Sequence, residues 1–263
     1  VKVSALQALA QINGALTAGV VLGTSNSTAI TGAMIYNRLA NNLTAAINGA
    51  SITPSGDVTV IAQDYLLGET TTGFSQVLNR ADSGVSSFID TDGGDYYDVD
   101  ASNDVDGSLA TPLKDQIKKG SLIVSGAMAI SVADVAVGAA VAINDIDNRF
   151  AARIDNSTIS NSSKKVETNA KADTFLVGAA GGVAASTKYG AGGGSVVWND
   201  INSAAASGIT NSTLTSKFVK AQAGNDSRII GLTGQVSAGK GAAVGLTLAY
   251  NKVTGGADAF SLG

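Results

Sequence analysis

The chain contains no cysteine and no histidine among its 263 residues. These absences exclude disulfides, thiol nucleophiles, zinc sites built on cysteine or histidine, and every catalytic dyad or triad that needs a histidine base. Aromatic residues make up only 5% of the chain. Because thick hydrophobic cores usually rely on large aromatic side chains, burial here must come from alanine and valine, which suit thin, flat layers.

No segment predicts a membrane span or a nucleic-acid interface. The most apolar segment, residues 120–143, is interrupted by Asp134 and is rich in glycine, serine and alternating valine, unlike a spanning helix. With 17 basic residues, 21 acidic residues and a single tryptophan, the chain has no basic, aromatic-rich patch of the kind that binds nucleic acid. The first residues, VKVSALQALAQ, lack the basic start, apolar run and cleavage site of a signal peptide.

One strand-like pattern occurs four times, each time as a hydrophobic segment that ends in asparagine. The copies are AMIYN, AVAIN, SVVWN and TLAYN, ending at Asn37, Asn144, Asn199 and Asn251. The last three asparagines are 55 and 52 residues apart (144 to 199, 199 to 251), and the first two are 107 apart (37 to 144), close to two such periods. Self-similarity at a period of this length indicates a repeat architecture.

The similarity extends beyond each asparagine. Two residues later comes an aliphatic side chain: Leu39, Ile146, Ile201 or Val253. An alanine-rich segment and a polar turn follow, in AAINGASIT (45–53), ARIDNSTIS (152–160) and SGITNSTLT (207–215). The next strand-like segments align Val58 with Val166 and Val219, and Ala62 with Ala170 and Ala223. We therefore expect equivalent residues of the copies to occupy equivalent positions in the fold.

Side-chain size alternates along these segments. Larger residues such as Tyr36 and Met34 precede the asparagine by one and three positions, and the residues between them are mostly smaller. A period of two predicts strands with one face on a core. Sandwich, barrel, propeller and solenoid all remain open. The open-ended array, the alanine, valine and glycine core, and the small polar turns favour an all-β, parallel β-solenoid.

The length of one solenoid coil decides what the asparagines do. We expect coils of ~20 residues, two to three per repeat. The asparagines would then lie at corners, tolerate a left-handed backbone and bond their own main chain, with ligand binding as the alternative. Coils of that length would keep the four asparagines off adjacent rungs. One coil per repeat would instead place them in a continuous ladder.

Residues 69–120 do not match the repeat. The apolar residues of 73–90 follow helical spacing, and Thr111, Pro112 and Gly120 predict the cap, first turn and end of a second short helix. We therefore predict a small helix–loop–helix insertion in one continuous solenoid. The organisation is solenoid repeat (1–68), acidic helical insertion (69–120) and solenoid repeats (121–263). Because the repeat pattern is cut at both ends, we expect a segment of a longer protein.

The loop of this insertion, residues 90–107, carries seven aspartates and no basic residue. Such a loop suits Ca²⁺, which binds six to eight oxygen atoms, although a solvated acidic loop is the alternative. The spacing is not that of an EF-hand, because the twelfth position from Asp90 is Ala101. The candidate calcium ligands are Asp90, Asp92, Asp95, Asp98, Asp100, Asp104 and Asp106. No other cofactor site and no catalytic residue is predicted.

The repeats resemble those of large secreted bacterial filamentous adhesins, including leukotoxin-like adhesins and autotransporter passengers. The resemblance is carried by VGAAVAINDIDNRFAARIDNSTIS (137–160) and by the run from GAAGGVAASTKYG to FVKAQAG (178–224), and it covers roughly 1–68 and 121–263. It implies a right-handed parallel β-helix outside the cell or at the bacterial cell surface, with no catalytic residues to transfer.

Three functions follow as hypotheses. The first is a structural and adhesive segment of an extracellular surface fibre, without catalysis, that meets a receptor or glycan on a host or neighbouring cell. The second is a self-assembling filament subunit whose partners are copies of itself stacked end to end, which exposed strand edges favour. The third is a carbohydrate-active enzyme on a β-helix, which would need two acids within catalytic reach on neighbouring coils.

Overall fold

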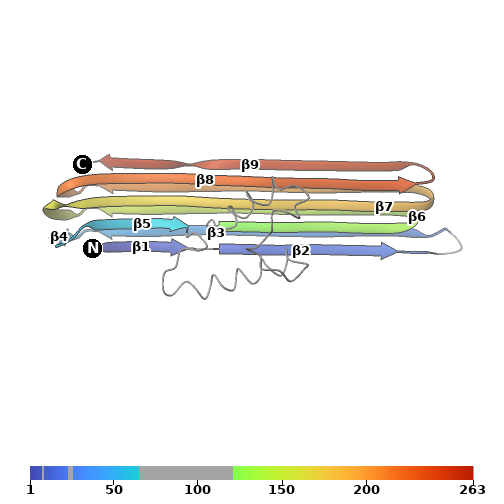
Figure 1. Ribbon diagram of the computed structural model, residues 1–263, viewed down its shortest axis with the longest axis horizontal. Helices are drawn as coiled ribbons and strands as arrows, with labels where there is room; N and C mark the ends of the chain where they lie inside the picture. The colour runs from blue at the N-terminus through green and yellow to red at the C-terminus, as the bar shows by residue number, and fades with distance from the viewer. Residues whose placement is uncertain (8, 23–25, 65–120, 263) are drawn as a thin grey trace, which may run out of the picture.

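The computed structural model describes residues 1–7, 9–22, 26–64 and 121–262. The predicted helix–loop–helix insertion (69–120) and its seven aspartates lie outside these residues. Within the described residues all regular structure is strand (Figure 1). The strands are β1 (Lys2–Gln7), β2 (Leu9–Val20), β3 (Thr28–Asn48), β4 (Ser51–Ile52), β5 (Val58–Asp64), β6 (Ser121–Asp155), β7 (Thr158–Thr210), β8 (Thr213–Gly239) and β9 (Ala243–Leu262).

Every paired strand is parallel to its neighbour, and each repeat lies on the next one in register except for shifts between Ala133 and Val135 and between Asn161 and Lys165. The repeated asparagines pair in the order Asn37, Asn144, Asn199, Asn251. The aliphatic residues two positions later pair in the same way, as do the aligned valines and alanines: Leu39, Ile146, Ile201 and Val253; Val58, Val166 and Val219; Ala62, Ala170 and Ala223. The predicted all-β class and the alignment of the repeats are confirmed.

The chain runs out along one sheet layer and back along a second, and we call one such passage a circuit. Layer one contains β1, β2, β5, β8 and residues 121–132 and 166–186. Layer two contains β3, β9 and residues 135–155 and 190–210. Figure 1 shows the long strands running horizontally while successive circuits stack vertically. Inward side chains of both layers form shared clusters, such as Ala140 and Val197 of layer two with Ala127 and Ala180 of layer one.

The expected coil of ~20 residues is wrong. Ser121 of one repeat pairs directly with Thr174 of the next, and Asn144 pairs directly with Asn199. One repeat is therefore one circuit. The spacing of 107 residues between Asn37 and Asn144 is also a single circuit, because these two residues pair directly. The extra length is residues 65–120, which lie between β5 and β6.

Asp64 and Ser121, the described residues on either side of 65–120, lie in the middle of a layer and not at a corner. In the first circuit Gln7 and Leu9 are separated by one residue, and their partners in the second circuit are Asp64 and Ser121. The Ser121 hydroxyl donates to Oδ1 of Asp64 at 3.1 Å. The two residues that flank the segment are therefore fixed side by side within layer one.

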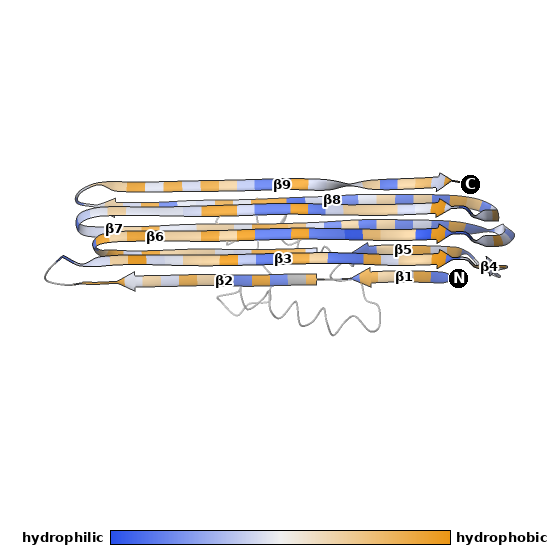
Figure 2. Ribbon diagram, turned by 180° about the vertical axis from the view of Figure 1, so that it is seen from behind, coloured by the Kyte–Doolittle hydropathy of each residue, from blue (hydrophilic) through white to orange (hydrophobic). Residues whose placement is uncertain are grey.

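In the segments that end at the repeated asparagines, the inward face is the one with the smaller side chains. Ile35 and Val197 are buried, whereas the larger Tyr36 and Trp198 point outward and are 57% and 44% exposed. The two layers lie close together at this point, so alanine, serine and asparagine fill the space between them and the larger side chains of this segment lie outside. Elsewhere the interior also holds large side chains, such as Phe150 and Phe175. Figure 2 shows polar segments of neighbouring strands lying together around the middle of the strands' length.

The prediction that the repeated asparagines lie at corners is wrong. Asn37, Asn144 and Asn199 lie within strands and are 0% exposed. The asparagines with a left-handed backbone are others, and two of them, Asn156 (φ 49) and Asn211 (φ 47), occupy the predicted polar turns. The predicted turn chemistry therefore holds for these segments but not for the repeated asparagine.

The repeated asparagines form a hydrogen-bonded ladder through all four circuits. Nδ2 of Asn37 donates to Oδ1 of Asn144 at 2.7 Å, Asn144 donates to Asn199 at 2.8 Å, and Asn199 donates to Asn251 at 2.8 Å. Asn13 of layer one donates to Asn37. Each inner amide thus gives one hydrogen bond and accepts one, which satisfies polar groups that would otherwise destabilise the interior.

Glycines of layer one make room for this ladder. A Cβ atom added to Gly178 would lie 2.8 Å from Nδ2 of Asn144, and one added to Gly231 would lie 2.8 Å from Nδ2 of Asn251. Both distances are shorter than a carbon atom tolerates. The ladder and the opposing glycines therefore form one packing unit.

A carboxylate ties three circuits together at the corner between the layers. Asp134, 3% exposed, accepts the backbone N–H of Ser27 at 3.1 Å, the hydroxyl of Thr187 at 2.6 Å and the ammonium of Lys188 at 3.0 Å. The hydrogen bond from Thr187, with those from Ser27 and Lys188, lowers the pKa of Asp134 to about 2.

Asp134→Asn should lower the melting temperature at pH 7 by several degrees, because the amide cannot accept all three bonds as an anion does. A lowered pKa in the folded state means that Asp134 stabilises the fold above the ordinary pKa of ~3.9 and that this stability is lost as pH falls toward 2. The melting temperatures of the two proteins should therefore converge between pH 4 and about 2. Melting curves that stay parallel over this range would contradict the assignment.

Candidate functional site

An aromatic column runs across the outer surface of layer two. The residue before each ladder asparagine points outward, and the four stack in register as Tyr36, Ile143, Trp198 and Tyr250. The rings of Trp198 and Tyr250 stack with their centroids 4.2 Å apart and their planes at 30°. This contact follows from strands that lie ~4.8 Å apart in register. The column has exposed apolar neighbours toward the corner, among them Met34 and Leu248.

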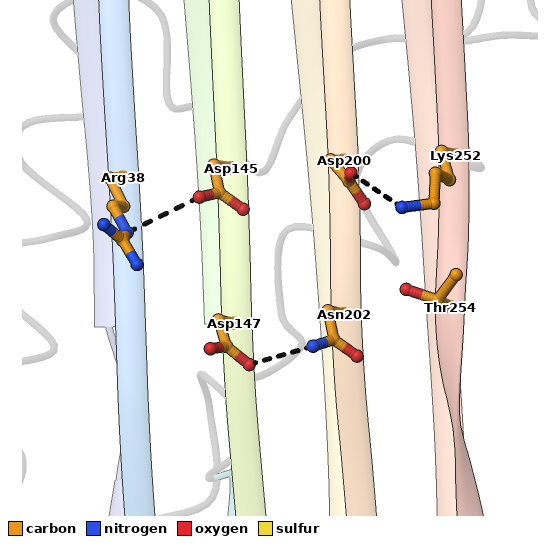
Figure 3. Close-up of a pocket in the computed structure, with 7 residues that line it drawn as sticks. All are labelled: Arg38, Asp145, Asp147, Asp200, Asn202, Lys252 and Thr254. Atoms are coloured by element: carbon orange, nitrogen blue, oxygen red, sulfur yellow. Dashed lines mark hydrogen bonds and ion pairs between the residues drawn. The ribbon is translucent and has the colours of Figure 1, made fainter.

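Charged side chains stand directly beside this column. The residue after each ladder asparagine also points outward, and these four pair in register as Arg38, Asp145, Asp200 and Lys252. Nε of Arg38 lies 3.5 Å from Oδ2 of Asp145, and Nζ of Lys252 lies 3.1 Å from Oδ2 of Asp200 (Figure 3). All four side chains are partly exposed, from 26% for Asp200 to 59% for Arg38.

A second polar column follows two residues further along the strands. Nδ2 of Asn202 donates to Oδ1 of Asp147 at 3.2 Å, and Nε of Arg149 lies 3.6 Å from the same oxygen. The Thr254 hydroxyl donates to the backbone oxygen of Ile201 at 3.2 Å. We call the seven residues drawn in Figure 3 the polar strip: Arg38, Asp145, Asp147, Asp200, Asn202, Lys252 and Thr254.

The polar strip contains paired acids on neighbouring circuits, which the enzyme hypothesis required. Asp145 and Asp200 are register partners. Glycoside hydrolysis, however, needs one carboxyl group kept as an acid, usually by an apolar pocket. Here each carboxylate binds a cationic side chain on an open sheet face. The arrangement is better suited to binding a polar ligand than to acid–base catalysis.

Two further carboxylates lie in the interior of layer one, where residues 65–120 join the fold. Asp64 is 2% exposed and Asp173 is 1% exposed. Burial raises the pKa of Asp64 to about 8, against the opposing effect of the hydrogen bond from Ser121, and the charge of Asp173 raises it further. Nζ of Lys171 lies 2.6 Å from Oδ2 of Asp173. Neither carboxylate is accessible enough to meet a ligand.

Asp64→Asn should remove a pH dependence of stability. Because the folded-state pKa is raised, the acid form of Asp64 is compatible with the fold at low pH, and stability is lost as pH rises from ~4 to about 8. The variant should match the wild type at about pH 4 and melt several degrees higher at pH 9. If the variant instead melts lower at pH 9, Asp64 stabilises the fold as an anion and the assignment fails.

The structure bears on only some of the sequence-based site predictions. The candidate calcium ligands, Asp90 to Asp106, lie outside the described residues. In the parts of the chain that the structure describes, no three acidic side chains gather to hold a metal. Three of the four repeated asparagines, Asn37, Asn144 and Asn199, are 0% exposed and cannot meet a ligand, contrary to the ligand-binding interpretation. The polar strip was not predicted, although its signal is in the repeat: a charged residue follows every ladder asparagine.

The fold and this surface define an all-β protein of stacked parallel circuits with a repeated outer face. No family model matches the chain, and neither a curated protein nor a solved structure matches it. Over the described residues, no helix has the length and apolar character needed to cross a membrane.

Proposed function

We propose that the chain is a structural and adhesive segment of an extracellular bacterial surface fibre, and that its circuits form a right-handed parallel β-solenoid. One observation carries the proposal: four repeats lie on one another in register, so both core and outer surface repeat along the stacking direction. Such quasi-one-dimensional stacks extend by adding repeats and present long surfaces for binding. Crossovers between parallel strands are right-handed in nearly all proteins, which supports the proposed hand.

The circuit length makes this fibre a ribbon. A strand of 21 residues such as β3 spans ~70 Å at ~3.3 Å per residue, whereas each circuit adds only ~4.8 Å along the stacking direction. A fibre of this repeat is therefore ~7 nm wide and two sheet layers thick. Each rung of the fibre takes a full repeat of the sequence, for example from Ser121 to its partner Thr174. Because each rung is long, the outer face of the fibre is broad.

The experiment measures both the shape of the folded chain and its adhesion to cells. Negative-stain electron microscopy of the purified chain should show flat particles whose longest dimension is ~7 nm. Beads coated with the folded chain should adhere to cultured epithelial cells or to bacterial cells, and beads coated with the heat-unfolded chain should not. Particles without the flat shape, or equal adhesion of folded and unfolded coats, would contradict the proposal.

The second candidate, end-to-end self-assembly, is favoured by the surface of the last circuit. Val253 is 49% exposed, although its partners Ile146 and Ile201 are 0% exposed. A second copy that continued the register would cover it. The same stacking would also place Arg38 of that copy against Lys252, and like charges directly opposite each other destabilise paired strands.

Sedimentation at low and high salt separates the two candidates. If copies stack, polymers should form at high salt, where the repulsion between Arg38 and Lys252 is screened, and should dissociate at low salt. A monomer over the full range of salt and protein concentration would exclude the self-assembling subunit and leave the adhesive segment in place.

A further inference from the structure

We infer that the polar strip and the aromatic column together form a binding site for an uncharged glycan chain that lies along the stacking direction. The inference rests on the proposed adhesive function and gives its partner a chemical class. It depends on three features of the outer face of layer two: its charge balance, its hydrogen-bonding groups and its apolar border.

The charges of the strip cancel. The aspartates Asp145, Asp147 and Asp200 are matched by Arg38 and Lys252 within the strip and by Arg149 beside it. A surface that recognised an anion or a nucleic acid would carry an excess of positive charge. A surface that held a cation would leave its carboxylates unpaired, whereas each of these lies beside a basic side chain. The balance favours a neutral ligand.

The paired groups suit hydroxyls in particular. A hydroxyl group donates one hydrogen bond and accepts up to two, so it can bridge a carboxylate and a neighbouring cation. The separations of 3.5 Å for Arg38–Asp145 and 3.6 Å for Arg149–Asp147 exceed the usual N–H···O distance. These ion pairs therefore leave hydrogen-bonding capacity for a ligand, and Asn202 adds an amide that can both donate and accept.

The aromatic column supplies apolar contact along the same line. Trp198 and Tyr250 are 44% and 37% exposed. Each combines an apolar ring with a polar N–H or O–H group, so it can contact a ligand that has both apolar and polar groups. The column lies two residues from the first polar column, ~6.6 Å away along the strand. A sugar ring is of comparable breadth, so its C–H groups can contact the aromatic rims while its hydroxyls reach the strip.

The repetition of the strip determines the shape of the ligand. Neighbouring circuits are ~4.8 Å apart, so the four described circuits extend the two columns over ~14 Å. The site is open and elongated, without an enclosing pocket. It therefore matches an extended chain of several sugars that contacts successive circuits, and not a single small molecule.

Affinity electrophoresis tests the site directly. The folded chain is run in native gels that contain a soluble β-glucan, a mannan or a galactan, and in gels that contain a sulfated polysaccharide. At least one neutral polysaccharide should retard the wild type. Trp198→Ala and Asp200→Ala should each weaken the retardation about ten-fold or more, as expected for central contact residues.

Matched controls separate binding from folding. Lys217→Ala changes an exposed residue of layer one and should leave the retardation unchanged. Trp198→Tyr keeps an aromatic ring in the column and should retain most of the binding. Circular dichroism and melting curves should be close to wild type for every variant that is scored.

Three results would overturn the inference: no retardation by any neutral polysaccharide, retardation unaffected by Trp198→Ala and Asp200→Ala, or retardation by the sulfated probe alone that about 0.5 M salt abolishes. The bead assay distinguishes this failure from failure of the adhesive function. Beads that adhere equally well with both variants would point to another partner, such as a protein, and would leave adhesion standing. Glycan binding without bead adhesion would uphold the site and remove the adhesive function.

Discussion

Asn144→Asp should lower the free energy of unfolding by about 3–5 kcal/mol at pH 7, because it places an unpaired carboxylate in the interior. Asn144 is 0% exposed, and its Nδ2 is the donor to Oδ1 of Asn199. An aspartate of the same shape would put two acceptor oxygens opposite each other and would leave both unsatisfied. Urea unfolding measured by circular dichroism gives the free energy directly.

The loss should depend on pH in a defined direction. The interior must raise the pKa of the introduced carboxyl group, so the variant is destabilised increasingly as pH rises above ~4. At pH 4 a protonated side chain regains an O–H donor toward Asn199, and part of the stability should return. Asn156→Asp, at an exposed corner, is the matched control and should change stability by less than about 0.5 kcal/mol. Equal losses for the two variants would show that the ladder is not buried as described.

Gly178→Ala should cost about 3–5 kcal/mol, because an added methyl group displaces the ladder and breaks hydrogen bonds in the interior. The new Cβ atom would lie 2.8 Å from Nδ2 of Asn144 and 3.0 Å from Nδ2 of Asn199. Neither amide can move away without losing its partner in the next circuit. The same urea titration measures the effect.

Gly126→Ala is the internal control for this prediction. Gly126 pairs with Ala179, the residue after Gly178, and a Cβ atom added to it would meet nothing within 4 Å. Alanine is also better suited to a strand interior than glycine, so the variant should be as stable as the wild type or slightly more stable. A comparable loss at both glycines would mean that general strand effects, and not contact with the ladder, set the cost.

Much of the fold could be predicted from the repeat. The alignment that matched Leu39, Ile146 and Ile201 is the register of neighbouring strands. The polar turns at Asn156 and Asn211 were also recognisable, because asparagine tolerates the left-handed backbone that they adopt. Turns and side-chain alternation depend on residues that are close in the sequence, so they can be predicted without the tertiary structure.

The coil length and the direction of the faces could not be obtained in the same way. A period states which residues are equivalent, but not how many times the chain turns within it. Alternation likewise leaves open which face is inside. The hydrophobicity of large residues such as Trp198 suggests burial, yet Trp198 is exposed. The asparagine face is the one that packs inward, because glycines of the opposite layer such as Gly178 leave room for it, and that fit depends on residues distant in the sequence.

The polar strip was within reach of the sequence but was overlooked. Its first column is the position after each ladder asparagine, where Arg38, Asp145, Asp200 and Lys252 are all charged. Whether these charges meet or stand far apart depends on the coil length. With coils of ~20 residues they would lie on separate rungs, whereas one circuit per repeat brings them into ion pairs.

Cross-linking tests whether one repeat forms one circuit in register, and the absence of natural cysteine makes the result unambiguous. Ala151 and Ala206 are partners on neighbouring circuits, one full repeat apart in the sequence. Ala151→Cys with Ala206→Cys should form a disulfide readily on mild oxidation, because Cα atoms ~4.8 Å apart fit its geometry. Ala151→Cys with Asn202→Cys, four positions out of register and on the same face, should not. Efficient cross-linking of the second pair, or failure of the first in a folded protein, would contradict this arrangement.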